Sequence, residues 1–281
     1  MNIYEETKFI MKKYNISANK DLGQNFLVDD SVIENIIEVS EIKSEDFVIE
    51  IGPGLGTLTS KLVEKAGKVI AIELDKKMIE ILNDRFSLYE NFKVINEDVL
   101  KVDLNNLIKN ENDKNYTVKI VANLPYYITT PIIMKLLEEK LNINSITVMI
   151  QKEVADRLTE IPGGKNTGAI TYCVYYYANA QEMMTVPNTS FIPAPKVNSE
   201  VIKLDIRKEP PVHLKNEEIF FKVIKASFMQ RRKTLLNGLA NAGIASKEKI
   251  KTILQQLELN ENTRGEQLTI EQFAEIANKL C

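Results

Sequence analysis

The chain has 281 residues and a mass of 32.0 kDa, which is long enough for more than one domain. Its single His and two Cys disfavour a zinc site built from His and Cys, because His213, Cys173 and Cys281 would have to supply all of its three or four ligands. A Ser-His-Asp enzyme is disfavoured as well, because it would have to use His213 in a loop-like run. The net charge of −3 argues weakly against a nucleic-acid partner.

The residue usage also bears on the compartment. Two Cys, one of them the last residue, suit a reducing cytosol. The first residues contain no apolar run of signal-peptide length, and no stretch reaches the length of a membrane span. We therefore expect a soluble cytoplasmic protein with no membrane partner and no metal.

Short runs rich in β-branched residues alternate with helical patterns through the first two thirds of the chain. The expected strands are 47–51, 68–74, 92–98, 118–124 and 145–151. Helical spacing lies between them in LTSKLVEKA, KKMIEILNDRF and TTPIIMKLLEEKL, and after them in KEVADRLTEI. A further helix is expected at SVIENIIEVSEI. This alternation predicts an α/β fold with a doubly wound, mostly parallel sheet.

The pattern changes after Pro187, where a proline-rich run is followed by one alternating strand, NSEVIKLDI. From Asn216 onward only helical patterns follow: EEIFFKVIKASFMQRRKTLLNGLANAG, SKEKIKTILQQLEL and TIEQFAEIANKL. Gly243 is expected to stop the first and Ser246 to cap the second. We expect a ligand-binding α/β domain over 1–210 and a small helical domain over 211–281.

Charge follows a similar division, so the small negative total hides its distribution. Residues 186–281 hold 15 Lys and Arg against 11 Asp and Glu, whereas the first 185 hold 21 against 28. The densest basic cluster, Arg231-Arg232-Lys233, falls within a predicted helix. By itself such a cluster is typical of a solvated helix face.

Ligands of open parallel sheets bind at the carboxyl ends of the strands, so the residues that follow each strand are candidates for a site. The first strand leads into Glu50, Gly52, Gly54 and Gly56. Glycines there let the backbone turn tightly and approach a ligand closely. Their G-x-G-x-G spacing differs from the dinucleotide pattern G-x-G-x-x-G and argues against a nicotinamide dehydrogenase.

Carboxylates end the next two strands. Glu73, about twenty residues past the glycines, can accept hydrogen bonds from both ribose hydroxyls of a nucleoside. A carboxylate of the Glu97-Asp98 pair can accept from an adenine amine. Either acid alone is typical of a helix cap. Together with the glycines, they predict a bound adenosine group.

The fourth strand leads into Asn123, Leu124, Pro125 and Tyr126. An Asn carbonyl and a backbone carbonyl from a rigid Leu-Pro turn can accept both hydrogens of an aromatic exocyclic amine. This favours the pyramidal amine and stabilises the positive charge that a methyl acceptor develops. Tyr126 can stack on a base turned out of its own stack. The motif therefore predicts methyl transfer to a base amine.

These segments resemble one known family. GQNFL (23–27), EIGPGLGTLT (50–59), IELD (72–75), NEDVL (96–100), NLPYYITTPI (123–132) and FIPAPKVNSEV (191–201) are similar to the motifs of KsgA-type rRNA adenine dimethyltransferases. The resemblance implies a Rossmann-like methyltransferase domain that uses S-adenosylmethionine. It also implies dimethylation of two adjacent adenosines in the 3′-terminal hairpin loop of small-subunit (16S) rRNA, on the assembling 30S subunit.

The resemblance also implies roles for individual residues. The implied cofactor contacts are Asn25, Leu27, Gly52, Gly54, Glu73, Asp98 and Asn123, with GQNFL forming part of an N-terminal lid. The implied catalytic residues are Asn123, Leu124, Pro125 and Tyr126, with Phe191 stacking the target base opposite the tyrosine. Similarity of the RRKTL run makes Arg231, Arg232 and Lys233 expected phosphate contacts. A monomer is the expected oligomeric state.

Two alternatives stay open besides the dehydrogenase. A large-subunit rRNA adenine methyltransferase of the macrolide-resistance type would share much of this site. A non-catalytic RNA-binding assembly factor would keep the fold only as a scaffold. The spelling of GQNFL and NLPYYITTP and the form of the C-terminal region favour the small-subunit enzyme.

Overall fold

The computed structural model describes residues 2–19, 22–164, 166–230 and 232–281, and the chain divides into two compact units. Unit 1 contains residues 1–155 and 180–206, and unit 2 contains residues 156–179 and 207–281. Sequence reasoning placed the division at 210/211, which assigns 156–179 to the first domain. In the structure this segment belongs to unit 2, because its helix α8 (Ala169–Tyr177) packs on α9 (Glu217–Phe228).

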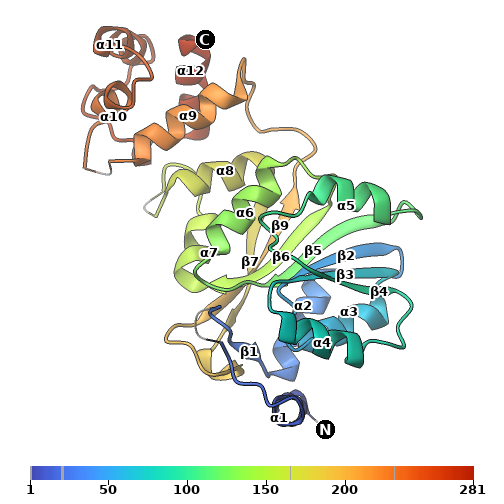
Figure 1. Ribbon diagram of the computed structural model, residues 1–281. Helices are drawn as coiled ribbons and strands as arrows, with labels where there is room; N and C mark the ends of the chain where they lie inside the picture. Colours follow the sequence, from blue (N-terminus) through green and yellow to red (C-terminus); the bar gives the residue numbers. More distant parts are fainter. Residues whose placement is uncertain (1, 20–21, 165, 231) are drawn as a thin grey trace. The chain divides into compact units, whose positions relative to one another are not determined.

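Unit 1 is built on a seven-stranded sheet with the strand order β4-β3-β2-β5-β6-β9-β7, flanked by helices (Figure 1). The strands are β2 (Asp46–Ile51), β3 (Lys68–Glu73), β4 (Phe92–Asn96), β5 (Thr117–Asn123), β6 (Ser145–Gln151), β7 (Ala178–Val186) and β9 (Ser199–Ile206). The first five pair in parallel, and β9 runs antiparallel to β6. The predicted doubly wound, mostly parallel sheet is confirmed.

The helices of unit 1 follow the strands in alternation. They are α1 (Ile3–Lys13), α2 (Asp30–Val39), α3 (Thr57–Lys65), α4 (Lys76–Arg85), α5 (Leu104–Glu111), α6 (Thr129–Glu138) and α7 (Lys152–Leu158), which runs into unit 2. Sequence reasoning missed α1, α5 and the edge strand β7. In β7 only the two end residues are buried, so it lacks the apolar alternation of a half-buried strand.

A two-stranded ribbon joins two segments that lie far apart in the sequence. Strand β1 (Phe26–Leu27) pairs antiparallel with β8 (Phe191–Ile192), which follows the short helix η1 (Asn188–Ser190). Val28 extends the pairing by donating its backbone N–H to Ser190 O at 2.9 Å. The GQNFL segment is therefore hydrogen-bonded to the proline-rich segment that carries Phe191.

Unit 2 is helical. Besides α8 and α9 it contains α10 (Leu235–Asn241), α11 (Lys247–Gln256), the short helix η2 (Gly265–Gln267) and α12 (Ile270–Leu280). Tyr172 is fully buried in its core, where its ring meets Phe273 edge-on at 4.8 Å and its hydroxyl donates to Leu268 O at 2.6 Å. Tyr176 is buried as well, and the partly buried Tyr175 and Tyr177 pack against the same core.

The helical pattern predicted from residue 217 to 243 is two helices in the structure. Helix α9 ends at Phe228, a turn follows, and Thr234 caps the start of α10 by accepting from Asn237 N. Gly243 has a left-handed φ of 71°, and the Ser246 side chain caps α11, so both predicted punctuation points are confirmed.

Candidate active site

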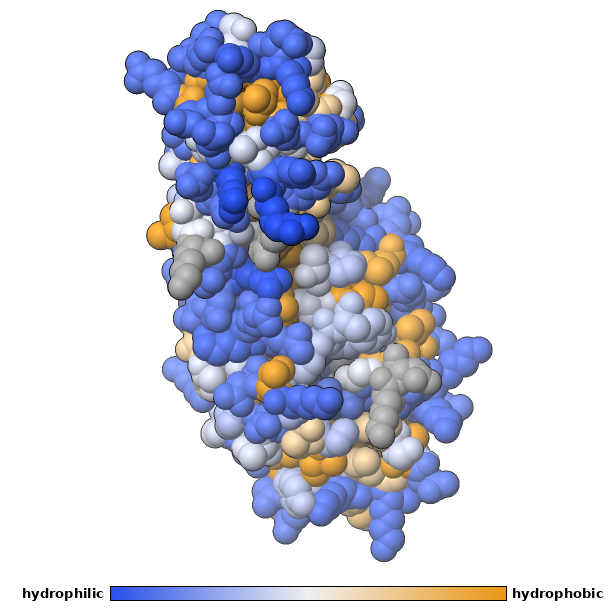
Figure 2. Space-filling view, turned by 90° about the vertical axis from the view of Figure 1, so that its left-hand side faces the viewer, coloured by the Kyte–Doolittle hydropathy of each residue, from blue (hydrophilic) through white to orange (hydrophobic). Residues whose placement is uncertain are grey.

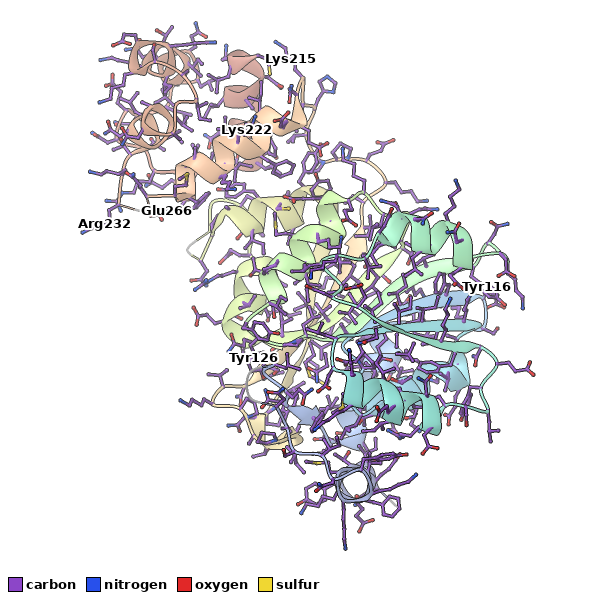
Figure 3. The ribbon with its side chains drawn as sticks, in the orientation of Figure 1. Tyr116, Tyr126, Lys215, Lys222, Arg232 and Glu266 are labelled. Carbon is purple, nitrogen blue, oxygen red and sulfur yellow. The ribbon has the colours of Figure 1, made fainter. Side chains whose placement is uncertain are left out.

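One pocket in unit 1 lies at the carboxyl ends of the parallel strands and is closed on one side by residues 22–27. It gathers loops that follow β2, β3, β4 and β5, together with the start of β8. Figure 3 labels Tyr126, which lies in the loop after β5. The predicted cofactor and catalytic residues that line this pocket are Asn25, Leu27, Gly52, Gly54, Glu73, Asp98, Asn123, Leu124, Pro125, Tyr126 and Phe191.

The glycine turn after β2 is held against the end of β3. Gly52 has a φ of 67° and Gly54 a φ of 57°, a left-handed conformation that glycine adopts without steric cost. Gly52 N donates to Ile72 O at 3.0 Å, and Gly54 N donates to Glu73 Oε2 at 3.1 Å. The turn therefore brings bare backbone to the pocket and orients a carboxylate there.

Glu73 is 7% exposed at the end of β3. Its Oε1 accepts from Asp75 N at 2.8 Å, and its Oε2 accepts from the glycine turn. Burial raises the pKa of Glu73, and these backbone hydrogen bonds act in the opposite direction. A carboxylate has about four acceptor positions, so Glu73 keeps capacity for ligand donors.

The pocket has an acidic character. Glu50, Glu73, Glu97 and Asp98 line it, and none of its described lining residues is Lys or Arg. Glu50 is 1% exposed and accepts from Thr59 Oγ1 at 2.6 Å. Burial is the main reason that the pKa of Glu50 rises to about 8, with a further contribution from the charge of Glu73. Such a pocket suits a ligand that carries positive charge and hydroxyl donors.

The loop after β5 is a tight turn that fixes the NLPY residues. Leu124 N donates to Met149 O at 3.1 Å, and Pro125 O accepts from Ile128 N at 3.2 Å. The Asn123 side chain points its Nδ2 toward Asn25 O, 3.5 Å away, so its Oδ1 is directed to accept from elsewhere. Asn123 therefore lines the pocket with an amide that the Asn25 carbonyl orients.

Two aromatic side chains line the same pocket. Tyr126 is half-buried and shares a 2.8 Å hydrogen bond with Ser199 Oγ, the first residue of β9. Phe191 is 3% exposed and pairs with Leu27 in the β1–β8 ribbon. The antiparallel pairing thus ties a predicted lid residue to the residue predicted to stack the target base.

Sequence reasoning missed the groups that orient the predicted site residues by hydrogen bonds. The Asn25 backbone carbonyl accepts from the Asn123 amide, Ser199 hydrogen-bonds to the Tyr126 hydroxyl, and Thr59 donates to Glu50. In addition, Gln24 Nε2 donates to Asp75 Oδ2 at 3.0 Å. These contacts join residues up to 98 positions apart. Only the Thr59 contact, nine positions from Glu50, has a spacing that a strand-turn-helix reading could have suggested.

The predicted basic cluster does not lie on a helix. Arg232 and Lys233 are exposed in the turn between α9 and α10, and Lys233 N donates to Gln230 O at 2.8 Å. Figure 3 shows Arg232 at the edge of unit 2, directed away from its core. Arg231 lies outside the described residues. Helix α9 ends at Phe228 and α10 begins after its cap Thr234, which leaves Arg232 and Lys233 between the two helices.

The described part of the chain contains neither a metal-binding group nor a membrane-spanning helix. Over the described residues, no group of three or more His, Cys, Asp or Glu is placed to hold a metal ion. In that same part of the chain, no helix has the length and apolar character needed to cross a membrane. Figure 2 shows a face on which hydrophilic residues predominate and apolar ones are scattered.

Comparisons with known proteins agree with one another. The family model for ribosomal RNA adenine dimethylase matches residues 15–281. A ribosomal RNA small subunit methyltransferase A from Geobacillus sp. is 48% identical over 277 residues, which cover 98% of this chain and 95% of the relative.

Two solved structures share the fold. A dimethyladenosine transferase from Plasmodium falciparum superposes with a TM-score of 0.74 and 27% identity, over 89% of this chain and 95% of that one. The 23S rRNA methyltransferase ErmE superposes with a TM-score of 0.68 over 91% and 99% of the two chains, and at 24% identity it shows similarity of fold alone.

Proposed function

The chain belongs to the ribosomal RNA adenine dimethylase family, and on that premise we propose that it methylates adenosines of small-subunit (16S) rRNA with S-adenosylmethionine as methyl donor. The proposed targets are the two adjacent adenosines in the 3′-terminal hairpin loop, modified on the assembling 30S subunit in the cytoplasm. The observation that carries the proposal is that Asn123, Tyr126 and Phe191 share one pocket with the glycine turn and Glu73. The proposed acting form is a monomer.

The pocket residues fit the proposed methyl donor. S-adenosylmethionine supplies an electrophilic methyl group on a positively charged sulfonium centre. In the proposal, Glu73 accepts hydrogen bonds from ribose hydroxyls and Asp98 from the adenine amine, while Gly52 and Gly54 allow close backbone approach. Asn25, Leu27 and Asn123 complete the contacts. Glu73, Glu97 and Asp98 of the lining, without a described Lys or Arg, favour a cationic ligand over an anionic one.

The acceptor side of the reaction rests on the loop after β5. We assign to Asn123 Oδ1 and the Leu124 carbonyl the role of accepting the two N–H bonds of the target amine. Because both acceptors are held by the fold, they stabilise the charge that develops on nitrogen without reorganising during the reaction. Tyr126 and Phe191 hold the extruded base by stacking, which offsets part of its unstacking cost.

Two other candidates remain distinguishable. Large-subunit rRNA is disfavoured as a substrate, because the relative that is about half identical is named for the small subunit, whereas ErmE is much more distant. A scaffold role without catalysis is disfavoured because the pocket brings together all predicted catalytic residues. An added assembly role is compatible with the enzyme.

The decisive assay uses labelled S-adenosylmethionine with small subunits that lack the modification and with large subunits in parallel. We expect dimethylated adenosines only in the 3′-terminal hairpin loop of the small subunit. Label confined to large-subunit RNA would overturn the substrate assignment, and no label on either particle would favour the scaffold.

The role of Asn123 predicts that Asn123→Ala lowers kcat by about 10²–10³-fold, the usual cost of removing one preorganised stabilising group. RNA binding should survive. Asn83→Ala, at an exposed position of α4 outside the pocket lining, is the matched control. Normal turnover by Asn123→Ala would refute the acceptor role.

We also propose that Arg231, Arg232 and Lys233 contact RNA phosphates. Replacing Arg232 and Lys233 by Gln should flatten the dependence of log K on log salt by about 0.7–0.9 for each phosphate that is no longer neutralised. Lys8→Gln with Lys12→Gln, two exposed lysines of α1, removes the same charge from unit 1. An unchanged salt slope in the Arg232 and Lys233 variant would return the cluster to a solvated surface.

A further inference from the structure

Tyr127 is an exposed aromatic residue at the mouth of the pocket, directly after Tyr126. It lines the pocket with 59% of its surface exposed, whereas its neighbour is half-buried. The turn closed by Pro125 O and Ile128 N explains the difference, because it directs the two consecutive side chains to different sides. One tyrosine therefore faces inward to Ser199, and the next stands at the rim.

The Tyr127 ring is supported from below by the lid segment. Gly23 has a left-handed φ of 60°, and a Cβ built on it would lie 3.2 Å from Tyr127 Cδ1 and 3.4 Å from Cε1. The ring thus lies over bare glycine backbone. A ring held this way loses little further side-chain freedom when a second flat group covers its open face.

The charges of the pocket define what kind of RNA contact can form there. Glu97 and Asp98 lie on the same lining, and no described lining residue is Lys or Arg to receive a phosphate. The described lining therefore offers RNA contacts to bases rather than to phosphates. Aromatic rings provide such contacts, because every base has a face that can stack.

We infer that Tyr127 is a second stacking surface, which holds the base that flanks the target adenine in the RNA strand. Extruding the target base leaves its neighbour with an uncovered face, and adjacent residues of one turn can serve adjacent bases. Tyr126 then takes the target base and Tyr127 the flanking base. This inference rests on the proposed function and extends it to the base next to the adenosine that is being methylated.

The chain has no tryptophan, so Tyr127→Trp places the sole indole of the protein at this position. Small subunits are prepared with a synthetic 3′-terminal rRNA segment, either intact or with an abasic ribose immediately 5′ or immediately 3′ of the one adenosine whose methylation is followed. We expect intact particles to change the indole emission of this variant, and one of the two abasic forms to remove that change. Tyr4→Trp, on α1 outside the pocket lining, is the control and should not distinguish the particles.

Methyl transfer provides the second readout. Tyr127→Ala should raise the KM for intact particles by about 5- to 150-fold, which corresponds to the ~1–3 kcal/mol of one base-aromatic stack. The loss should vanish on the abasic particle that also abolishes the emission change. Affinity for S-adenosylmethionine should stay within about twofold. Tyr127→Leu keeps an apolar contact with Gly23, and should lose stacking equally.

Three results would overturn the inference: an unchanged KM, equal losses on intact and both abasic particles, or an indole emission in Tyr127→Trp that follows the methyl donor and ignores the RNA. The last result would make Tyr127 a lid contact only. If the wild-type enzyme methylates none of the intact particles, the proposed function fails instead, so the two failures are separate.

Discussion

Glu50 makes the stability of the protein depend on pH in a predictable direction. Its carboxyl is 1% exposed, with one hydrogen bond from Thr59 Oγ1 at 2.6 Å, and burial raises its pKa from 4.5 to about 8. In the unfolded chain the same carboxyl is in water and titrates near 4.5. The perturbation that tests this is Glu50→Gln, which keeps an acceptor for Thr59 and removes the titrating group.

The sign follows from proton linkage. Below pH 4.5 Glu50 is protonated in both states and contributes no pH dependence. Between pH 4.5 and about 8 only the unfolded state has lost the proton, so the free energy of unfolding falls as pH rises. The slope is about 1.4 kcal/mol per pH unit, and over the whole window the loss is roughly 5 kcal/mol. Above pH 8 both states are ionised, and the loss stays constant.

The measurement is urea unfolding of wild type and Glu50→Gln at pH 5.5 and pH 8.0. We expect the free energy of unfolding of Glu50→Gln, relative to that of the wild type, to rise by about 3 kcal/mol from pH 5.5 to pH 8.0. Asn83→Ala, at an exposed position of α4, removes no titrating group and should leave the pH dependence of the wild type unchanged. Parallel stability curves for wild type and Glu50→Gln would refute the reasoning, because Glu50 would then titrate alike in both states.

Two further predictions concern buried contacts that stabilise unit 1. Gly56→Ala should destabilise unit 1 by about 1–3 kcal/mol, because its φ is 80° and the new Cβ would lie 2.6 Å from Phe86 Cε2. The control in thermal melts is Gly243→Ala, where the φ is 71° but nothing lies within 4 Å of the new Cβ. Equal losses of stability in the two variants would show that the clash with Phe86 contributes nothing. Lys119→Met should lower the free energy of unfolding by about 3–5 kcal/mol, because it leaves the buried Asp46 carboxylate without the ammonium group that contacts it at 2.9 Å. Urea unfolding of this variant is compared with that of the double variant Lys119→Met with Asp46→Leu. Removing both charges should recover most of the loss.

The order of strands and helices in unit 1 could be predicted from local patterns. Residues 47–51, and residues 69–73 of the expected strand 68–74, are buried within a parallel sheet, so they form mostly apolar runs that local sequence reveals. Helices with strong apolar periodicity, such as α4 and α6, were predicted for a similar reason. Strand β7 and the break between α9 and α10 were missed, because solvent exposure and helix capping decide them rather than apolar spacing.

The sequence by itself determined which chemical groups the protein carries and in which order they follow the strands. Because parallel strands end at one edge, this order already indicated that the glycines, Glu73, Asp98 and Asn123 share a pocket. Tertiary structure decided what orients them. Asn25 O directs the Asn123 amide, Ser199 holds the Tyr126 hydroxyl, and Gly23 supports the Tyr127 ring. Contacts between residues 73 to 104 positions apart leave no periodicity in a sequence, and only the closed chain brings them within hydrogen-bond or van der Waals distance.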